Sequence, residues 1–296
     1  MKNLHYTLIT GASSGIGKAL AKKCASSNMN LILVALPDSG LEAYSQQLKM
    51  EYGVQVQTIV LNLADPEASI AIYETSRKEN WHVNMLINNV GLGNVGAFEE
   101  CSYNAIQYQM MLNMNVMVGL TRLFLRQIKE SRNGYILNVS SIAGMFPLPY
   151  KSIYSATKSF VYSFSRSLYF ELENDQVMVS CLCPGPTATN DQVQETNRNL
   201  GWKARYFTKS AKEVAEIAID KMLQRKFLII PGWENKIMAL AGKIVPEAIL
   251  LRYLGKTFRK NAPSTNKAAS MENLPVKESQ NQVLSSSPIA NKIKSY

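Results

Sequence analysis

Short apolar runs alternate with segments of helical period from residue 4 to about residue 231. The runs are apolar on successive residues and have the length of one strand, which favours strands buried on both faces of a parallel sheet. Such strands need helical crossovers between them. The pattern therefore predicts an α/β fold, a single doubly wound domain with a parallel sheet of about seven strands and helices on both faces. The expected strands are 4–10, 31–36, 54–61, 83–87, 134–139, 177–183 and 226–231, and the expected helices are 15–27, 40–52, 65–79, 102–130, 153–174 and 210–224.

The alternation stops after residue 231, where a different pattern begins. Apolar positions in 232–260 are interrupted by charged ones, which predicts an amphipathic helical extension. This extension contains no run of 18 uncharged apolar residues, so we expect no spanning helix. Three roles remain open: a cap on a substrate cleft, a subunit interface, or a peripheral membrane contact through 232–258. Residues 261–296 are rich in Pro, Ser, Asn and Lys and are expected to form a disordered tail.

The net charge of +10 comes without any run of five or six consecutive basic residues. We therefore expect a solvated basic surface and no nucleic-acid partner, with acidic ligands and membranes left open. The four cysteines contain no C-x-x-C pair, so no metal site is predicted. No signal-peptide pattern precedes the first strand. These observations favour a cytoplasmic protein, with a position at the periphery of a membrane as the alternative.

A glycine-rich turn, 10–17, follows the first strand and opens the first helix. Gly11 allows a tight turn, Gly15 lets the backbone approach a pyrophosphate, and Gly17 permits close packing of helix on strand. Free N–H groups at the helix start favour phosphate. Taken alone, this string also fits a plain strand-to-helix turn. In context it predicts a dinucleotide-binding catalytic domain of the Rossmann type over residues 1–231.

Four further motifs follow in order, each at the end of an expected strand or at the start of a helix. They are Asn88-Asn89-Val90-Gly91, Asn138-Val139-Ser140-Ser141, Tyr154-Ser155-Ala156-Thr157-Lys158 and Pro184-Gly185-Pro186-Thr187-Ala188-Thr189. In this order and at these intervals, the set resembles the classical short-chain dehydrogenase/reductase family over residues 4–231. The resemblance implies an oxidoreductase acting on CH–OH groups with NAD(P) as acceptor.

The resemblance also implies catalytic roles. Tyr154 is the expected acid/base. Lys158 lies four residues later on the same helix face, where its ammonium is expected to lower the pKa of Tyr154 and to hold the nicotinamide ribose. Ser141, rather than Ser140, is expected to bind the substrate carbonyl oxygen. Asn115 corresponds to the family asparagine that supports a water and proton path.

Asn113 is the competing position for that asparagine. The expected cofactor contacts are Gly11, Ser13, Ser14, Gly15, Ile16, Gly17, Asn62, Leu63, Asn88, Tyr154, Lys158, Pro184, Gly185 and Thr189. Asn62 stands where the family usually has an aspartate beside the adenine. Ala35 and Leu36 occupy the end of the second strand, so the acidic residue typical of NAD enzymes is absent. The arginine of many NADP enzymes is absent too. We expect NADP(H) to be favoured over NAD(H).

Two loops, 145–150 and 190–209, are apolar or aromatic where loops are ordinarily polar. Trp202, Tyr206 and Phe207 belong to the second. This composition fits two interpretations: packing of the loops against the core, or a small hydrophobic carbonyl or alcohol substrate, such as a ketoacyl chain or a steroid-like ring. The family resemblance implies a homodimer or homotetramer. Two alternatives remain, a non-catalytic cofactor-sensing regulatory protein on the same fold and a membrane-surface scaffold that uses the C-terminal region.

Overall fold

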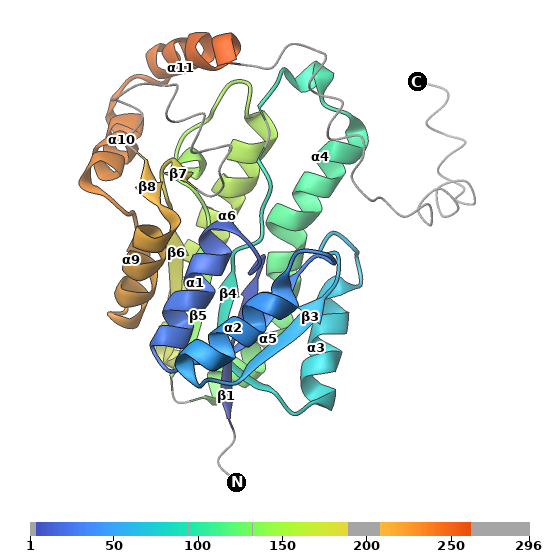
Figure 1. Ribbon diagram of the computed structural model, residues 1–296. Coiled ribbons are helices and arrows are strands. Elements are labelled where there is room, and N and C mark those ends of the chain that lie inside the picture. Colours follow the sequence, from blue (N-terminus) through green and yellow to red (C-terminus); the bar gives the residue numbers. More distant parts are fainter. Residues whose placement is uncertain (1–3, 94, 132, 189–207, 262–296) are drawn as a thin grey trace.

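A seven-stranded sheet forms the centre of the computed structural model, which describes residues 4–93, 95–131, 133–188 and 208–261 (Figure 1). The strand order is β3-β2-β1-β4-β5-β6-β9, and each neighbouring pair is parallel. The order reverses direction between β1 and β4, so the carboxyl ends of these strands flank a crevice where ligands bind in open α/β sheets. The predicted α/β fold with a parallel sheet of about seven strands is confirmed.

The sheet consists of β1 (His5–Thr10), β2 (Asn30–Ala35), β3 (Val56–Val60), β4 (His82–Asn88), β5 (Gly134–Val139), β6 (Val177–Leu182) and β9 (Leu228–Ile229). A small second sheet pairs β7 (Thr187–Ala188) with β8 (Lys209–Ser210). The α-helices are α1 (Gly15–Ser26), α2 (Leu41–Tyr52), α3 (Ala68–Lys78), α4 (Tyr103–Met110), α5 (Val116–Glu130), α6 (Ser152–Glu171), α9 (Ala211–Leu223), α10 (Trp233–Ile244) and α11 (Glu247–Asn261).

Helices cover both faces of the sheet (Figure 1). One core cluster joins α1, α2 and α9 to one face, and a second joins α3, α4, α5 and α6 to the other. Strand β2 supplies both clusters, because successive side chains point to opposite faces. Leu33 enters the first cluster, whereas Ile32 and Val34 enter the second. This explains why the strands are apolar on successive residues.

The expected single helix over 102–130 is interrupted. α4 ends at Met110, a π-helical turn named η2 (Met111–Asn115) follows, and α5 begins at Val116. A π turn adds residues to the helix and shifts which side chains face the protein. Here it buries Asn113 and leaves Asn115 exposed. The last expected strand is also shorter than predicted, since only Leu228–Ile229 pairs with β6.

The C-terminal helices α10 and α11 lie beyond the carboxyl edge of the sheet (Figure 1). Their inner faces contact a small apolar cluster of Ala143, Phe146 and Leu148. No helix within the described part of the chain is long and apolar enough to cross a membrane. The expected disordered tail falls outside the described residues from position 262 onward.

Candidate active site

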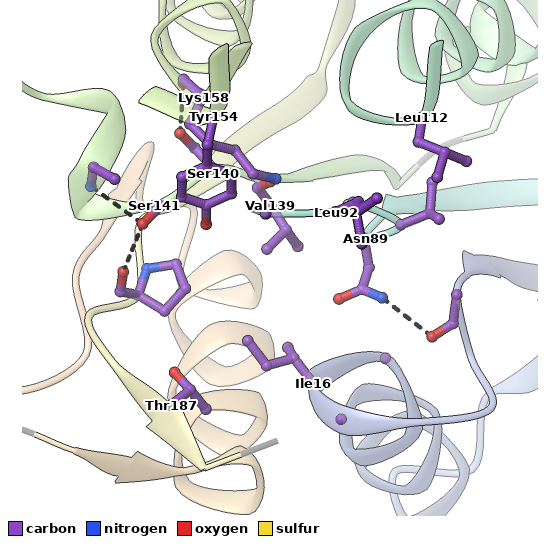
Figure 2. Close-up of a pocket in the computed structure, with 18 of the residues that line it drawn as sticks. Ile16, Asn89, Leu92, Leu112, Val139, Ser140, Ser141, Tyr154, Lys158 and Thr187 are labelled. Atoms are coloured by element: carbon purple, nitrogen blue, oxygen red, sulfur yellow. Dashed lines mark hydrogen bonds between the residues drawn. The ribbon is translucent and has the colours of Figure 1, made fainter. Parts of the chain in front are cut away.

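A pocket of about 900 Å³ lies at the carboxyl ends of the strands. It extends from the glycine turn after β1, past the ends of β2, β4, β5 and β6, to the inner faces of α10 and α11. Figure 2 shows Ser141, Tyr154 and Lys158 on one side of this space, with Ile16 and Thr187 on another. Loops brought together from distant parts of the chain therefore form one elongated site.

The glycine turn is shaped for close backbone approach. Gly11 and Gly15 adopt φ values of +65° and +52°, in the left-handed region that favours glycine. A Cβ atom at Gly17 would overlap both the carbonyl oxygen of Gly11 and the side chain of Asn89. Ser14 makes no side-chain cap on α1, and the first turn of α1 has no acidic residue. The N–H groups at this helix start are thus available to a phosphate, as a dinucleotide requires.

Asn89, rather than the predicted Asn88, borders the pocket. Asn88 is the last residue of β4 and points away, where its Nδ2 donates to Thr121 Oγ1 at 3.1 Å and to Asn138 Oδ1 at 2.8 Å. Asn89 Nδ2 donates to the carbonyl oxygen of Thr10 at 2.8 Å and so ties the end of β4 to the glycine turn. The two asparagines face opposite ways because side chains alternate along a strand. The pocket is therefore lined by Asn89 and not by Asn88.

Ser141 and Ser140 have separate surroundings. Ser140 Oγ donates to the carbonyl oxygen of Lys158 at 2.7 Å and braces α6. Ser141 Oγ accepts from Ala143 N at 3.1 Å and lies 3.4 Å from the carbonyl oxygen of Pro184 (Figure 2). A hydrogen bond with Ser141 lowers the pKa of Tyr154 in part, against the larger effect of burial. Ser141 is therefore the serine that meets the tyrosine hydroxyl.

Tyr154 and Lys158 lie on α6, and burial sets the ionisation of both. Lys158 is almost fully buried, and its Nζ donates to the carbonyl oxygen of Val139 at 2.9 Å. Burial lowers the pKa of Lys158 to about 8, although nearby Cys181 and Cys183 oppose that shift.

The Lys158 ammonium lies 5.9 Å from the centre of the Tyr154 ring. Even so, burial raises the pKa of Tyr154 above its ordinary value. The predicted lowering by Lys158 is thus not what the protein alone produces. Desolvation of the phenolate is the largest cause of this shift, and the hydrogen bond with Ser141 opposes it. Because its pKa is raised, the Tyr154 hydroxyl keeps its proton at neutral pH.

Asn113, rather than the predicted Asn115, lies beside the lysine. Asn113 Nδ2 donates to Leu92 O and to Thr157 Oγ1, both at 2.9 Å, and its Oδ1 accepts from Leu92 N at 2.8 Å. A Cβ atom built at Gly91 would lie 3.0 Å from Lys158 Nζ and 3.2 Å from Asn113 Oδ1, so both atoms flank one glycine. Asn115 is exposed. The π turn η2 changes the direction in which these side chains point, so that Asn113 is buried and Asn115 is exposed.

The far end of the pocket is neutral. Ala35 at the end of β2 lines it together with Leu36 and Ser39, and Asn62 and Leu63 line it after β3. Neither an acidic residue nor an arginine is among the described lining residues. Lys18 lies outside this pocket and holds its ammonium 4.7 Å from the centre of the Tyr44 ring.

Several lining residues were not singled out from the sequence. Thr187, Met238, Leu254 and Phe258 line the pocket, and the last three come from the C-terminal helices. Alternation of apolar residues marked those helices as amphipathic but gave no signal for which residues reach the site. The predicted Thr189 and the loop residues Trp202, Tyr206 and Phe207 fall outside the described part of the chain. Among the described residues, no group of three or more His, Cys, Asp or Glu is placed to hold a metal ion.

Comparison with known proteins shows the family. The family model described as short chain dehydrogenase matches residues 5–200, so this chain belongs to the short-chain dehydrogenase family of nicotinamide-dependent oxidoreductases. The chain is 34% identical over 199 residues to a very-long-chain 3-oxoacyl-CoA reductase of Anas platyrhynchos. That match covers 62% of this chain and 60% of the relative's length.

Two solved structures show the fold with bound cofactor. A short-chain dehydrogenase from Sphingobium yanoikuyae in complex with NADPH has a TM-score of 0.70 and 30% identity, covering 81% of this chain and 93% of that one. A short-chain dehydrogenase/reductase from Burkholderia phymatum in complex with NAD has a TM-score of 0.71 and 25% identity, covering 85% and 97%. Similar structures therefore hold either nicotinamide cofactor.

Proposed function

We propose that this protein interconverts a hydrophobic ketone and a secondary alcohol with NADP(H), using Ser141, Tyr154 and Lys158. The observation that carries the proposal is the convergence of these three side chains on one wall of a pocket that begins at the glycine turn. The cofactor supplies or accepts the hydride when it is bound. The remaining chemistry belongs to the protein.

In the reducing direction, Ser141 donates a hydrogen bond to the carbonyl oxygen, and Tyr154 donates its proton to that oxygen as negative charge develops. The raised pKa of Tyr154 keeps the hydroxyl protonated beforehand. Lys158 is held by the carbonyl oxygen of Val139 close to the tyrosine, so its positive charge stabilises the phenolate that the transfer leaves behind. Asn113 positions the loop that carries Gly91 beside this lysine.

The residues present fit a dinucleotide. The proposed contacts within the described pocket are Gly11, Ser13, Ser14, Gly15, Ile16, Gly17, Asn62, Leu63, Asn89, Tyr154, Lys158, Pro184, Gly185 and Thr187. The neutral ending of β2 at Ala35 and Leu36 supports NADP(H), because it lacks the carboxylate that repels a 2′-phosphate. Titration with NADPH and NADH, followed by nicotinamide fluorescence, measures this preference. Tighter binding of NADH would contradict it.

A hydrophobic substrate is supported by the apolar side chains at the Tyr154 end of the pocket, namely Phe146, Leu148, Met238, Leu254 and Phe258. The similar duck protein is named as a very-long-chain 3-oxoacyl-CoA reductase, in agreement with a long apolar ketone. The contact of α10 and α11 with this end supports the capping role among the three that the sequence left open.

The enzyme proposal is tested by replacing Tyr154 with Phe. Because the ring is kept and only the proton donor is lost, we expect NADPH oxidation with aliphatic and cyclic ketones to fall by at least about a hundredfold, the usual contribution of general acid catalysis. Binding of NADPH should stay within about twofold. A variant that keeps most of its rate refutes this mechanism. A folded wild-type protein that binds NADPH and reduces no ketone favours the cofactor-sensing alternative.

The outer face of α10 and α11 supports a second proposal, peripheral contact with a membrane. Ile237, Leu240 and Ile244 lie on one face of α10 and are each more than half exposed, and Ile249 and Tyr253 on α11 are also more than half exposed. Lys236 and Arg252 are exposed nearby and suit anionic lipid. Flotation with phosphatidylserine vesicles should carry the wild-type protein upward but not an I237E/L240E variant. Equal flotation of both proteins refutes this contact.

Assembly as a homodimer or homotetramer and a cytoplasmic location stay predictions. Light scattering coupled to size exclusion measures the first, and fluorescence microscopy of the tagged full chain measures the second.

A further inference from the structure

The pocket carries one charged side chain that the proposed mechanism does not use. Among its described lining residues only Lys151 and Lys158 are charged, and none is acidic. Lys158 donates to the carbonyl oxygen of Val139 and stabilises the phenolate in the proposed mechanism. Lys151 has no such task.

Lys151 is fixed in place by the backbone. It immediately precedes α6, its N–H donates to Leu148 O at 3.1 Å, and its carbonyl oxygen accepts from Ser155 N at 2.9 Å. It stands three residues before Tyr154, so the two side chains are neighbours on the first turn. The start of α6 therefore directs a cation toward the reacting end of the pocket.

The ammonium of Lys151 lies between two aromatic rings. Its Nζ is 5.8 Å from the centre of the Tyr154 ring and 5.2 Å from the centre of the Phe258 ring on α11. Within the described part of the chain it forms no ion pair with a carboxylate. Burial lowers the pKa of Lys151 below its ordinary value, because it disfavours the charged form of the side chain. A half-buried cation in apolar surroundings has an unfavourable free energy unless it is paired.

We propose that Lys151 pairs with an anionic group of the substrate, so that the preferred substrate is an apolar ketone or alcohol that also carries a carboxylate or phosphate. This inference rests on the proposed reductase function and names its substrate class. In this proposal the carbonyl carbon contacts Tyr154 and Ser141. The anion that pairs with Lys151 then either lies within a few bonds of the carbonyl carbon or belongs to a carrier attached to the substrate. The apolar chain then occupies the space lined by Phe146, Leu148 and Met238.

The test compares substrates that differ in charge and little in shape. The probes are 5-oxodecanoate and its neutral methyl ester, with 3-oxodecanoyl coenzyme A as an anion on a carrier. For the wild-type protein with NADPH, we expect kcat/KM to be about 10- to 100-fold higher for the oxo acid than for the ester, the range of a charge-assisted hydrogen bond. The K151M variant should lose this preference, and the loss should appear as a raised KM for the oxo acid that exceeds any change in KM for the ester. The K151R variant should retain the preference.

A role in packing alone is separated by the same data. If Lys151 only holds Phe258 and α11 in place, K151M lowers kcat/KM for the oxo acid and the ester by the same factor, and the proposal is overturned. The proposal is also overturned, with no variant needed, if the wild-type protein has a higher kcat/KM for the ester than for the oxo acid and no higher kcat/KM for the thioester than for the ester. If K151M lowers kcat/KM for the thioester alone, the anion that pairs with Lys151 belongs to the phosphates of the coenzyme A carrier, and the proposal is supported.

A matched control is K212M, which removes a lysine whose side chain is 84% exposed on α9 and does not line the pocket. Its substrate preference should equal that of the wild-type protein. If the wild-type protein reduces no ketone at all, the proposed function itself fails. If it reduces neutral ketones readily but shows no preference for anions, only the inference about Lys151 fails.

Discussion

The position of Asn113, rather than Asn115, beside Lys158 gives the sharpest test of how the site is built, because both asparagines can be replaced by alanine and compared. Asn113 is 2% exposed and makes three hydrogen bonds, two with Leu92 and one with Thr157. Asn115 lies two residues away, is exposed, and shares the π turn. The same substitution to alanine at both positions therefore compares a buried hydrogen-bonding side chain with an exposed one in the same turn.

The magnitude follows from what N113A would leave unpaired. The Leu92 carbonyl oxygen would keep a partner, because Gln109 Nε2 also donates to it at 3.0 Å. The Leu92 N–H and the acceptor site of Thr157 Oγ1 would lose theirs. At about 1–3 kcal/mol for each unsatisfied group, with Leu92 only half-buried, we expect about 2–3 kcal/mol of lost stability. This corresponds to a fall in Tm of about 5–10 °C for a domain of this size.

Activity should separate the two variants as well. Without Asn113 the Gly91 loop loses its link to the turn that lies beside Lys158. We expect kcat of N113A to fall at least about tenfold, which equals about 1.4 kcal/mol of transition-state stabilisation. N115A should change stability by less than about 0.5 kcal/mol, as most surface substitutions do. Thermal unfolding by circular dichroism and NADPH oxidation measure both quantities. The reasoning is refuted if N115A matches N113A in either measurement.

Two further predictions concern ionisation and the glycine turn. Burial lowers the pKa of Lys158 to about 8. Between about pH 8 and the ordinary pKa of a lysine, the unfolded chain therefore holds more protons than the folded one, and the free energy of unfolding should rise with pH across that window. Denaturant titrations of wild-type protein and K158M from pH 7 to about pH 10.5 measure this, and identical pH profiles would contradict the assignment. Replacing Gly17 by Ala should abolish NADPH binding, because its Cβ would overlap the Gly11 carbonyl oxygen. G96A is the matched control, since a Cβ there meets nothing within 4 Å. Equal NADPH affinity in G17A and G96A would refute the role given to the turn.

Much of this protein was predictable from patterns along the chain. The alternation of apolar runs with helical segments predicted the parallel sheet, because each strand is covered on both faces and must be apolar on both. The glycine turn and the strand-end motifs predicted the location of the site, because the carboxyl ends of parallel strands meet at one edge. Ser141 was separated from Ser140 by its interval to Tyr154, and the structure places Ser141 toward the tyrosine.

Only the tertiary structure decided between neighbours that differ by one or two positions. Asn89 lines the pocket and Asn88 does not, because side chains at the end of β4 point alternately away from the pocket and into it. Asn113 replaces Asn115 because a π turn, which no periodicity showed, shifts the helix phase. The raised pKa of Tyr154 and the position of Lys151 against Phe258 depend on burial and on contacts between distant segments. Order along the chain determined which motifs meet at the site, and packing in three dimensions determined which side chain of each motif faces it.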